Sequence, residues 1–470
     1  MSAPHSPLVA PMAPLAPIPH QLLIKGATII SMDASVGNLA SGDILVVDGV
    51  IAAIGPALPA GGAEVIDATG MIAIPGMVDT HRHAWEGQLR RINPNAATLE
   101  DYCNATHFSF AKYYRPRDIY VGNLLTALGC IDAGITTVID NSHNSRTAAH
   151  SDAAVEALLD AGIRALHAAG PPVAGDWDEA HWPGNLARLQ ARYFGDPASL
   201  VTLAMMAQLE PDQWAIARAL GIPIVTEFFG GAMVTELESL HRQGLLGSDN
   251  IFNHCTCLPD SGWQMLREAG VRVNVCPRSD AHYGIEDGMH AWQAALHHGI
   301  RPGLSVDNET SYSGDMFMEM RVAFYLQRAL VHPQRLHGHH HAPAPTNALR
   351  LLQAATIDGA AVAGLEQRTG SLAPGKQADL VLVRTGDLNL YPVNNAIGTV
   401  VHAAERSNID TVIIGGRVRK RGGVVLGVDQ AALRAAIDES CGHLFDAAGY
   451  RPDLFAELFA PLHHAPGGAA

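Results

Sequence analysis

The sequence predicts an α/β protein in which a (β/α)8 TIM-like barrel carries a flanking β-sandwich built from both chain ends. From residue 74 to 370, apolar strand-like runs such as "GITTVIDNS" and "VRVNVCP" alternate with helical patterns. About eight β/α units in roughly 300 residues match a barrel better than an open doubly wound sheet. Several runs also end in polar residues, and the carboxyl ends of barrel strands are where active sites form. These polar strand ends are His81, His83, Asn141, Glu227, His254 and Asp307.

The two ends of the chain share a different pattern. Short β-rich runs with Gly and Asp turn signals occupy residues 21–73, and the same style returns in "QADLVLVR" and "IDTVIIGGRV". Neither set is long enough to bury a core alone, so we expect them to fold together. The predicted domains are a flexible tail (1–20), a β-sandwich (21–73 plus 371–430), a catalytic barrel (74–370), and a C-terminal helical extension and tail (431–470).

Composition narrows the function classes. The chain has 31 Lys and Arg against 46 Asp and Glu, a formal net charge of −15, and no large basic cluster. This balance argues against a nucleic-acid footprint or a polybasic membrane patch. No run approaches the roughly 20 apolar residues of a membrane span, and the proline-broken N-terminus lacks a basic region typical of signal peptides. We therefore expect a cytoplasmic protein with a small-molecule substrate.

The segment "PGMVDTHRH" carries the first candidate metal ligands. His81 and His83 are separated by one residue at the end of an apolar strand, so both imidazoles project to the same side. This geometry suits two adjacent ligands of one metal ion. Cys255 and Cys257, in contrast, form C-T-C rather than the C-x-x-C spacing of a zinc ribbon.

The same segment resembles the first-strand motif of the amidohydrolase superfamily, and "LAPGKQADLVLV" resembles the return segment of its flanking sandwich. The resemblance covers residues 21–430. It implies one or two divalent metals held by the histidine pair together with residues from later strands. By this resemblance Asp307 binds metal and shuttles the proton of the metal-bound water. His254 contacts the attacking water or substrate, or binds metal itself.

Strand five departs from the family pattern. Where related deaminases and chlorohydrolases read roughly T-H-x-x-E, this chain reads "IVTEFFGG", with Glu227 in the histidine position. A carboxylated lysine is excluded because no lysine lies between Lys112 and Lys376. A carboxylate can bridge two ions, so we predict that Glu227 is a ligand; the alternative is a salt-bridged core acid.

A further resemblance concerns "VDTHRHAWEGQLR", "TTVIDNSHN" and "RPGLSVDNETSYSGDMFMEMR". Together they look like a branch of the superfamily with dinuclear non-heme iron or manganese–iron members, among them thioesterases and oxygen-using hydroxylases. On that analogy His143 is a ligand of the second ion. The alternative is that His143 orients a metal ligand or the substrate. The predicted substrate-binding residues are Trp85, Glu86, His282 and Asn308.

Three functional hypotheses follow. The first is a metal-dependent hydrolase that cleaves a C–N bond (amide, amidine or ring amino) of a small molecule through metal-bound hydroxide, using Fe, Mn or Zn. There Asp307 accepts the proton and His254 steadies the oxyanion or leaving group. The second is a dinuclear iron or manganese/iron oxygenase that hydroxylates a small substrate. The third is a non-catalytic partner in a hetero-oligomer; otherwise we expect a homo-oligomer.

Overall fold

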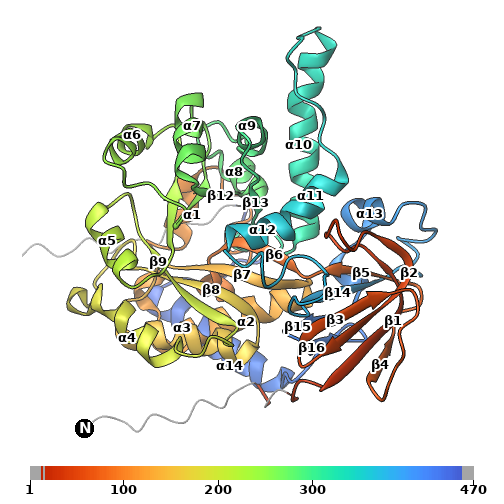
Figure 1. The fold of residues 1–470 in the computed structure, drawn as a ribbon. Coiled ribbons are helices and arrows are strands. Elements are labelled where there is room, and N and C mark those ends of the chain that lie inside the picture. The colour runs from red at the N-terminus through yellow and green to blue at the C-terminus, as the bar shows by residue number, and fades with distance from the viewer. Residues whose placement is uncertain (1–11, 14–15, 458–470) are drawn as a thin grey trace, which may run out of the picture.

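The computed structural model of the protein describes residues 12–13 and 16–457. Figure 1 shows two sheets side by side, a barrel wrapped by helices and a flanking sheet at one side of it. Parts of two predicted segments, most of the tail at 1–20 and the end of the extension at 431–470, lie outside the described residues.

The barrel consists of eight parallel strands that neighbour one another in chain order. An isolated parallel bridge between Arg82 and Asp307 returns the last strand to the first, which closes the ring. The predicted fold class, a (β/α)8 barrel with a sheet domain built from both chain ends, is confirmed. The barrel strands are β6 (Met77–Arg82), β7 (Ile135–Ser142), β8 (Arg164–Ala169), β9 (Val201–Met206), β10 (Ile224–Phe228), β11 (Asn250–His254), β12 (Arg272–Val275) and β13 (Gly303–Leu304).

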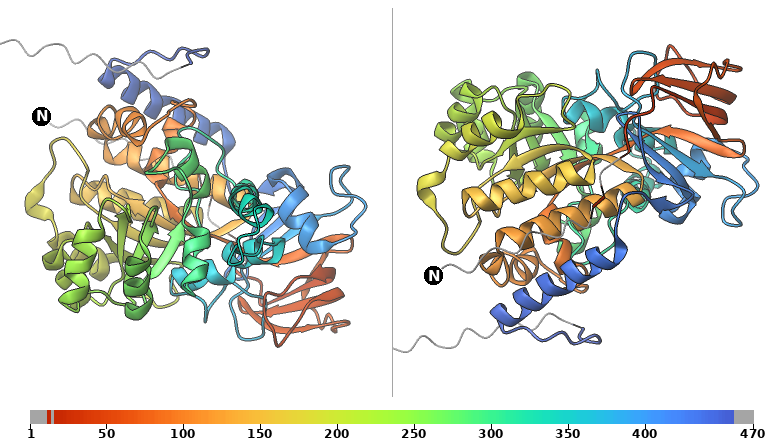
Figure 2. Two further views of the ribbon diagram at one scale, coloured as in Figure 1. Left: turned by 90° about the horizontal axis from the view of Figure 1, so that it is seen from above. Right: turned by 90° about the horizontal axis from the view of Figure 1, so that it is seen from below.

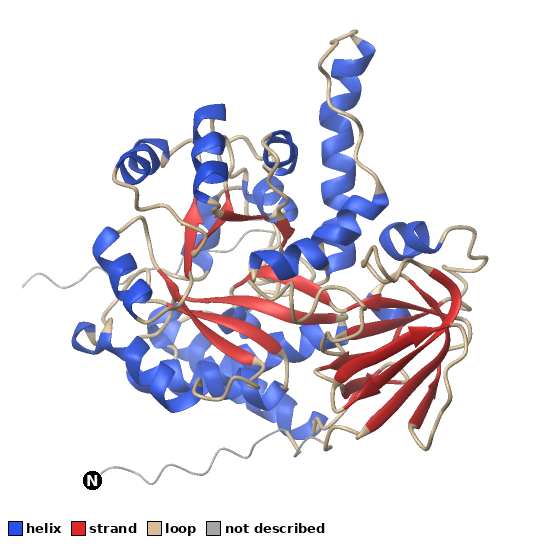
Figure 3. Cartoon of the chain, viewed as in Figure 1, coloured by secondary structure: helices blue, strands red, loops and turns tan. Residues whose placement is uncertain are grey.

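Helices surround these strands (Figure 3). Several end at a glycine in the left-handed region, such as Gly162 (φ +65°) after α3 and Gly270 (φ +72°) after α7, where a residue without Cβ turns the chain back toward the next strand. The α-helices of the barrel are α1 (Leu99–Ala105), α2 (Pro116–Asp132), α3 (Ala148–Ala161), α4 (Gly184–Tyr193), α5 (Pro211–Ala219), α6 (Val234–Arg242), α7 (Asp260–Ala269), α8 (Pro277–Tyr283), α9 (Trp292–His297), α10 (Met316–Leu336), α11 (Ala348–Ala354) and α12 (Ile357–Val362). Short 3-10 helices are η1 (Ala84–Leu89), η2 (Ala111–Tyr113) and η3 (Glu179–His181).

The flanking sheet joins the two ends of the chain. Strand β5 pairs antiparallel with β14, and the strand order is β17-β16-β15-β14-β5-β1-β2-β3, with β4 also pairing with β1. Its own core contains buried Leu22, Ile44 and Leu380. The strands are β1 (Gln21–Ile29), β2 (Leu39–Val47), β3 (Val50–Gly55), β4 (Glu64–Asp67), β5 (Met71–Pro75), β14 (Leu380–Arg384), β15 (Ile409–Ile414), β16 (Arg417–Arg421) and β17 (Val424–Val425).

The chain passes from the flanking sheet to the barrel at Gly76, between β5 and β6. A Cβ at this position would lie 2.1 Å from Thr136 Oγ1, so only glycine fits against β7 here. A buried ion pair ties the same junction: Arg164 Nε donates to Asp379 Oδ2 (2.7 Å) and Arg164 Nη2 to Asp379 Oδ1 (2.9 Å). The two domains are therefore joined by polar contacts as well as by the chain.

The chain closes with helix α14 (Gln430–Ala448), which lies along α2 (Figure 2). Buried Ser440 Oγ donates to Asp118 Oδ1 (2.7 Å) at this contact. Between β14 and β15 are α13 (Ala396–Gly398), the π-helix η4 (Thr399–Ala403) and η5 (Arg406–Asn408). Within the described ranges, no helix has the length and apolar character needed to cross a membrane.

Candidate metal centre and active site

The six predicted metal ligands converge at one end of the barrel. Each sits at or just beyond the carboxyl end of its strand, and parallel strands bring these ends to one rim. His81 lies in β6 and His83 follows it, His143 follows β7, Glu227 lies in β10, His254 ends β11, and Asp307 follows β13.

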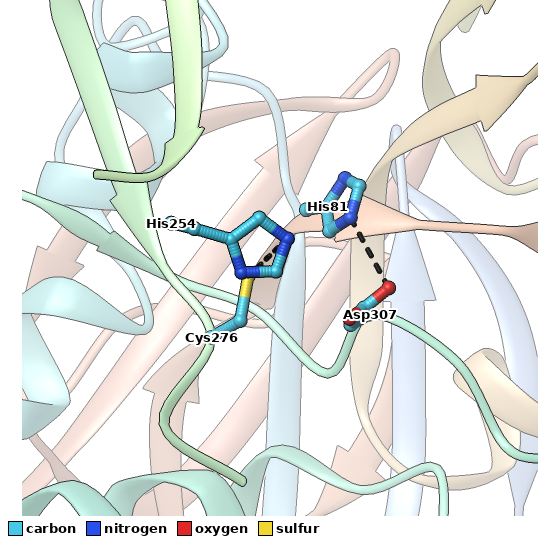
Figure 4. Close-up of side chains that lie close together, drawn as sticks. All are labelled: His81, His254, Cys276 and Asp307. Carbon is cyan, nitrogen blue, oxygen red and sulfur yellow. Dashed lines mark hydrogen bonds and ion pairs between the residues drawn. The ribbon is translucent and has the colours of Figure 1, made fainter. Parts of the chain in front are cut away.

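Asp307 faces both histidines of the H-x-H motif. Its Oδ1 lies 3.1 Å from His81 Nε2 and 3.1 Å from His83 Nε2. Figure 4 shows His81 and Asp307 on one side of this cluster, with His254 and Cys276 close by. One carboxylate oxygen and two imidazole nitrogens thus point toward a common position.

Glu227 completes the cluster from the opposite strand. Its Oε1 lies 3.5 Å from His81 Nε2 and 3.7 Å from His83 Nε2, while Oε2 lies 3.4 Å from His254 Nε2. Asn141 Nδ2 donates to Oε1 (3.0 Å) and Asn253 Nδ2 to Oε2 (3.2 Å). Among the described residues its ion-pair partners are all histidines, which differs from the salt-bridged core acid considered as the alternative.

The donor atoms fit a divalent cation. His81 Nε2 and Asp307 Oδ1 are buried and form no hydrogen bond within the described residues, although they lie close together. The ligand atoms of His81, His83 and Glu227 all lie within 4.8 Å of one another. Nitrogen and oxygen ligands bind zinc at about 2.0–2.2 Å, which places neighbouring ligand atoms about 3–4 Å apart in a tetrahedral shell. The observed separations match this requirement.

The charges of the cluster also favour binding of a cation. Burial opposes ionisation of Glu227 and Asp307, yet the neighbouring imidazoles hold the pKa of both carboxyls well below the usual range. Burial likewise disfavours a charged His83, but Asp307 raises its pKa to about 9. In the metal-free chain, protons on imidazoles balance the carboxylates, and a bound cation would take the place of these protons.

Helix α8 supports two of the candidate ligands from one short segment. Asp280 Oδ1 lies 2.7 Å from His254 Nδ1, and Ser279 Oγ donates to Asp307 Oδ2. His254 (φ +63°) and Asp307 (φ +72°) both adopt left-handed backbone conformations, which cost about 1–3 kcal/mol each in a non-glycine residue. The surrounding contacts thus hold both residues in strained positions. Ser279 and Asp280 were not predicted; their signal is their position directly after strand β12.

Two further histidines lie beside the cluster. The ring of His143 stacks on that of His83 with centroids 4.5 Å apart, and His107, in the turn after α1, meets His143 edge-on at 4.7 Å. His143 Nε2 and His107 Nδ1 are buried without a hydrogen-bond partner in the described chain. Burial and the charge of His83 lower the pKa of His107 to about 3 and that of His143 well below its ordinary value. Both rings are therefore uncharged and could offer a ring nitrogen to a metal ion. His107 was not among the predicted site residues.

A cavity of about 180 Å³ opens onto this cluster and is the candidate catalytic cavity. Its walls combine the candidate ligands with aromatic and apolar side chains. They are formed by His83, Leu99, Tyr102, Cys103, His107, His143, Val173, Gln208, Glu227, Phe229, Met233, His254, Tyr283, Ile285 and Asp307.

The predicted substrate-binding residues lie behind these walls. Trp85 is fully buried against His107 and Tyr114. Glu86 accepts a hydrogen bond from Tyr102 (2.7 Å), and burial raises its pKa to about 7.

Asn308 accepts a hydrogen bond from Tyr283 (2.9 Å), and His282 contacts Tyr283 and Tyr312 outside the cavity. Glu86 and Asn308 thus position wall residues instead of lining the cavity, and direct substrate contact by any of the four stays a prediction.

The fold and the site together define a barrel enzyme with imidazole and carboxylate ligands at the carboxyl ends of its strands. Comparison with known proteins gives the same class. Residues 221–419 match the model of the amidohydrolase family.

Curated relatives match along nearly the whole chain. A 5-methylthioadenosine/S-adenosylhomocysteine deaminase from Desulforudis audaxviator is 28% identical over 452 residues, covering 91% of this chain and 100% of the relative. A 5′-deoxyadenosine deaminase from Methanothermobacter thermautotrophicus is 28% identical over 428 residues, covering 86% and 94%.

Solved structures share the fold. An adenosine deaminase from Xanthomonas campestris with bound zinc superposes with a TM-score of 0.79 at 23% identity, covering 92% of this chain and 100% of that one. An atrazine chlorohydrolase from Arthrobacter aurescens TC1 complexed with zinc gives a TM-score of 0.77 at 20% identity, covering 89% and 100%. The chain is similar to enzymes of the amidohydrolase superfamily over most of its length, and the named deaminases among its relatives support a hydrolase. These matches support the predicted hydrolase and not the oxygenase alternative.

Proposed function

We propose that this protein is a metal-dependent deaminase that hydrolyses a C–N bond of a small molecule bearing a ring amino group, of the adenosine type on which its curated relatives are named to act. The observation that carries the proposal is the convergence of His81, His83, Glu227 and Asp307 on one position beside the catalytic cavity. Those four residues would hold the ion. His254 lies close enough to join them or to contact the substrate.

The protein's own residues would handle the protons of the reaction. A bound divalent ion supplies Lewis acidity, which acidifies a water molecule and polarises the group under attack. Asp307, steadied by Ser279, would accept the proton of the attacking water. His254, steadied by Asp280, would deliver a proton to the departing nitrogen, so that water adds to the ring carbon and ammonia leaves.

The number of ions and their identity are part of the proposal. Glu227 offers two carboxylate oxygens, and His143 and His107 present nitrogens that have no hydrogen-bond partner among the described residues. One ion would occupy the position between His81, His83 and Asp307. His143 would be a ligand of a second ion. Zinc, iron and manganese all accept such a mixed imidazole and carboxylate shell.

Metal analysis and turnover test this function together. We expect purified protein to retain about one or two divalent ions per chain and to release ammonia from 5′-deoxyadenosine or 5′-methylthioadenosine. Glu227→Gln should lose metal affinity at least tenfold, because it removes the charge and turns an amide NH2 toward Asn141 or Asn253. The matched control is Glu236→Gln on the exposed face of α6.

Several outcomes would overturn the proposal. Metal-free protein after growth in metal-replete medium would favour the non-catalytic partner. Unchanged metal affinity in Glu227→Gln would remove Glu227 from the ligand set. Oxygen uptake without ammonia release would replace hydrolysis by oxidation.

We further propose a cytoplasmic homo-oligomer. The assembly is tested by light scattering of the purified chain, with a monomer contradicting this expectation. A stable complex with a different chain in a pull-down from its source would favour the hetero-oligomer.

A further inference from the structure

A second pocket adjoins the catalytic cavity. It has a volume of about 560 Å³, and its walls include Trp177, Trp182, Met205, Glu179 and Glu210; we call it the tryptophan pocket. We propose that it binds a distal group of the substrate that is flat or apolar and either neutral or positively charged, an inference that rests on the proposed function. Anionic tails, such as carboxylates and phosphates, would be rejected.

The two spaces are adjacent because they share wall residues. His143, Val173 and Gln208 line both the catalytic cavity and the tryptophan pocket. The catalytic cavity alone, at about 180 Å³, is smaller than the roughly 300–1,000 Å³ of most small-molecule sites. A substrate larger than the catalytic cavity can therefore extend past His143 into the tryptophan pocket.

The walls of the tryptophan pocket offer aromatic faces and hydrogen-bond acceptors. Trp177 and Trp182 supply the faces, and no lysine or arginine is among the described residues that line it. Glu179 and Glu210 form no ion pair within the described chain, and Gln213 Oε1 is buried there without a hydrogen-bond donor. Tryptophan faces attract cations, and unpaired carboxylates disfavour anions. The pocket thus selects a group that donates hydrogen bonds or carries positive charge.

The pocket wall is held in place before any ligand binds. Buried Arg146, three residues after His143, donates to Ala174 O (2.7 Å) and Asp176 O (2.8 Å) in the segment that leads to Trp177. On the other side, Trp214 Nε1 donates to Gln208 O (2.8 Å). A preformed wall loses little conformational freedom when a ligand binds. Its preference for one ligand over another should therefore appear as a difference in binding affinity.

Binding of charge-matched probes tests the inference without requiring turnover. Isothermal titration of the full-length protein would compare benzyltrimethylammonium, a cation, with benzenesulfonate, an anion of similar size. We expect the cation to bind at least tenfold more tightly. Trp182→Leu should weaken its binding about tenfold, and the double variant Glu179→Gln/Glu210→Gln about fivefold or more. Tyr391→Leu, which alters an exposed aromatic residue far along the chain, is the matched control.

Equal binding of the two probes, or cation binding unaffected by Trp182→Leu and by the double glutamate variant, would overturn the inference. Turnover separates it from the proposed function. Cation binding that depends on Trp182 in a protein that releases no ammonia would overturn only the deaminase. Ammonia release in which Trp182→Leu leaves KM unchanged for every extended substrate would overturn only the tryptophan pocket.

Discussion

Replacing Arg164 by methionine removes one half of the buried ion pair between the barrel and the flanking sheet. Arg164 begins β8 and is 1% exposed; Asp379 precedes β14 and is also 1% exposed. The two side chains form a bidentate contact at 2.7 and 2.9 Å, and Asp379 Oδ1 also accepts a hydrogen bond from Gly415 N (2.6 Å). In Arg164→Met the Asp379 carboxylate stays buried. Of the contacts just described, it keeps only the hydrogen bond from Gly415 N.

The magnitude follows from leaving a charge unpaired. Removing one partner of a buried ion pair costs about 3–5 kcal/mol in the free energy of unfolding, whereas replacing both by apolar residues is often neutral. Arg164→Met and Asp379→Leu should therefore each cost about 3–5 kcal/mol. The double variant should cost only about 1 kcal/mol, because the hydrogen bond from Gly415 is still lost.

Urea unfolding followed by circular dichroism and by fluorescence measures these free energies, provided that the two transitions coincide. Metal content serves as the control. Arg164 is the first residue of β8, whereas the metal ligands lie at the carboxyl ends of the barrel strands. Single variants that cost less than about 1 kcal/mol, or a double variant as unstable as the sum of the singles, would refute the reasoning.

Three further predictions concern the site and the core. Asp280→Asn removes the charge that orients His254 and should lower metal affinity or activity about 10–100-fold; unchanged values in both would contradict the role of Asp280. Burial lowers the pKa of His290 from 6.5 to about 4, so this histidine is neutral when folded but takes up a proton when unfolded below pH 6.5. Stability is therefore lost as pH falls from 6.5 toward 4, by about 2 kcal/mol at pH 5. His290→Gln should flatten the pH dependence of unfolding by that amount, and an unchanged slope would exclude His290 as a source. Chelation should lower the unfolding free energy by about 2.7 kcal/mol relative to protein with metal at 100 times Kd, with recovery on adding metal back; an unaltered Tm would argue against a metal bound by the folded state.

The barrel was predictable because its signal is local. Each strand is an apolar run of a few residues, and the polar residue at its end marks the active rim, as for His254 and Asp307. The boundary between β5 and β6 at Gly76, in contrast, depends on contact with Thr136 of another strand. The apolar pattern runs on through this boundary, so the sequence alone does not reveal it.

The candidate site was predictable where residues sit on strands and less so where loops fold over it. His107 lies in a turn after α1, with no periodic pattern to mark it, yet its ring meets that of His143. Trp85 lies two residues after His83, so we predicted that it lines the cavity, but as part of the 3-10 helix η1 it is buried in the core. Which side of a loop faces a site depends on packing against distant elements.

The central claim is that Glu227 is a metal ligand. A crystal structure of metal-loaded protein, with anomalous scattering measured at the absorption edge of the bound metal, tests this directly. We predict a peak about 2.0–2.4 Å from nitrogen atoms of His81 and His83 and from carboxylate oxygens of Asp307 and Glu227. A peak held without Glu227, or no peak among these four residues, would contradict it.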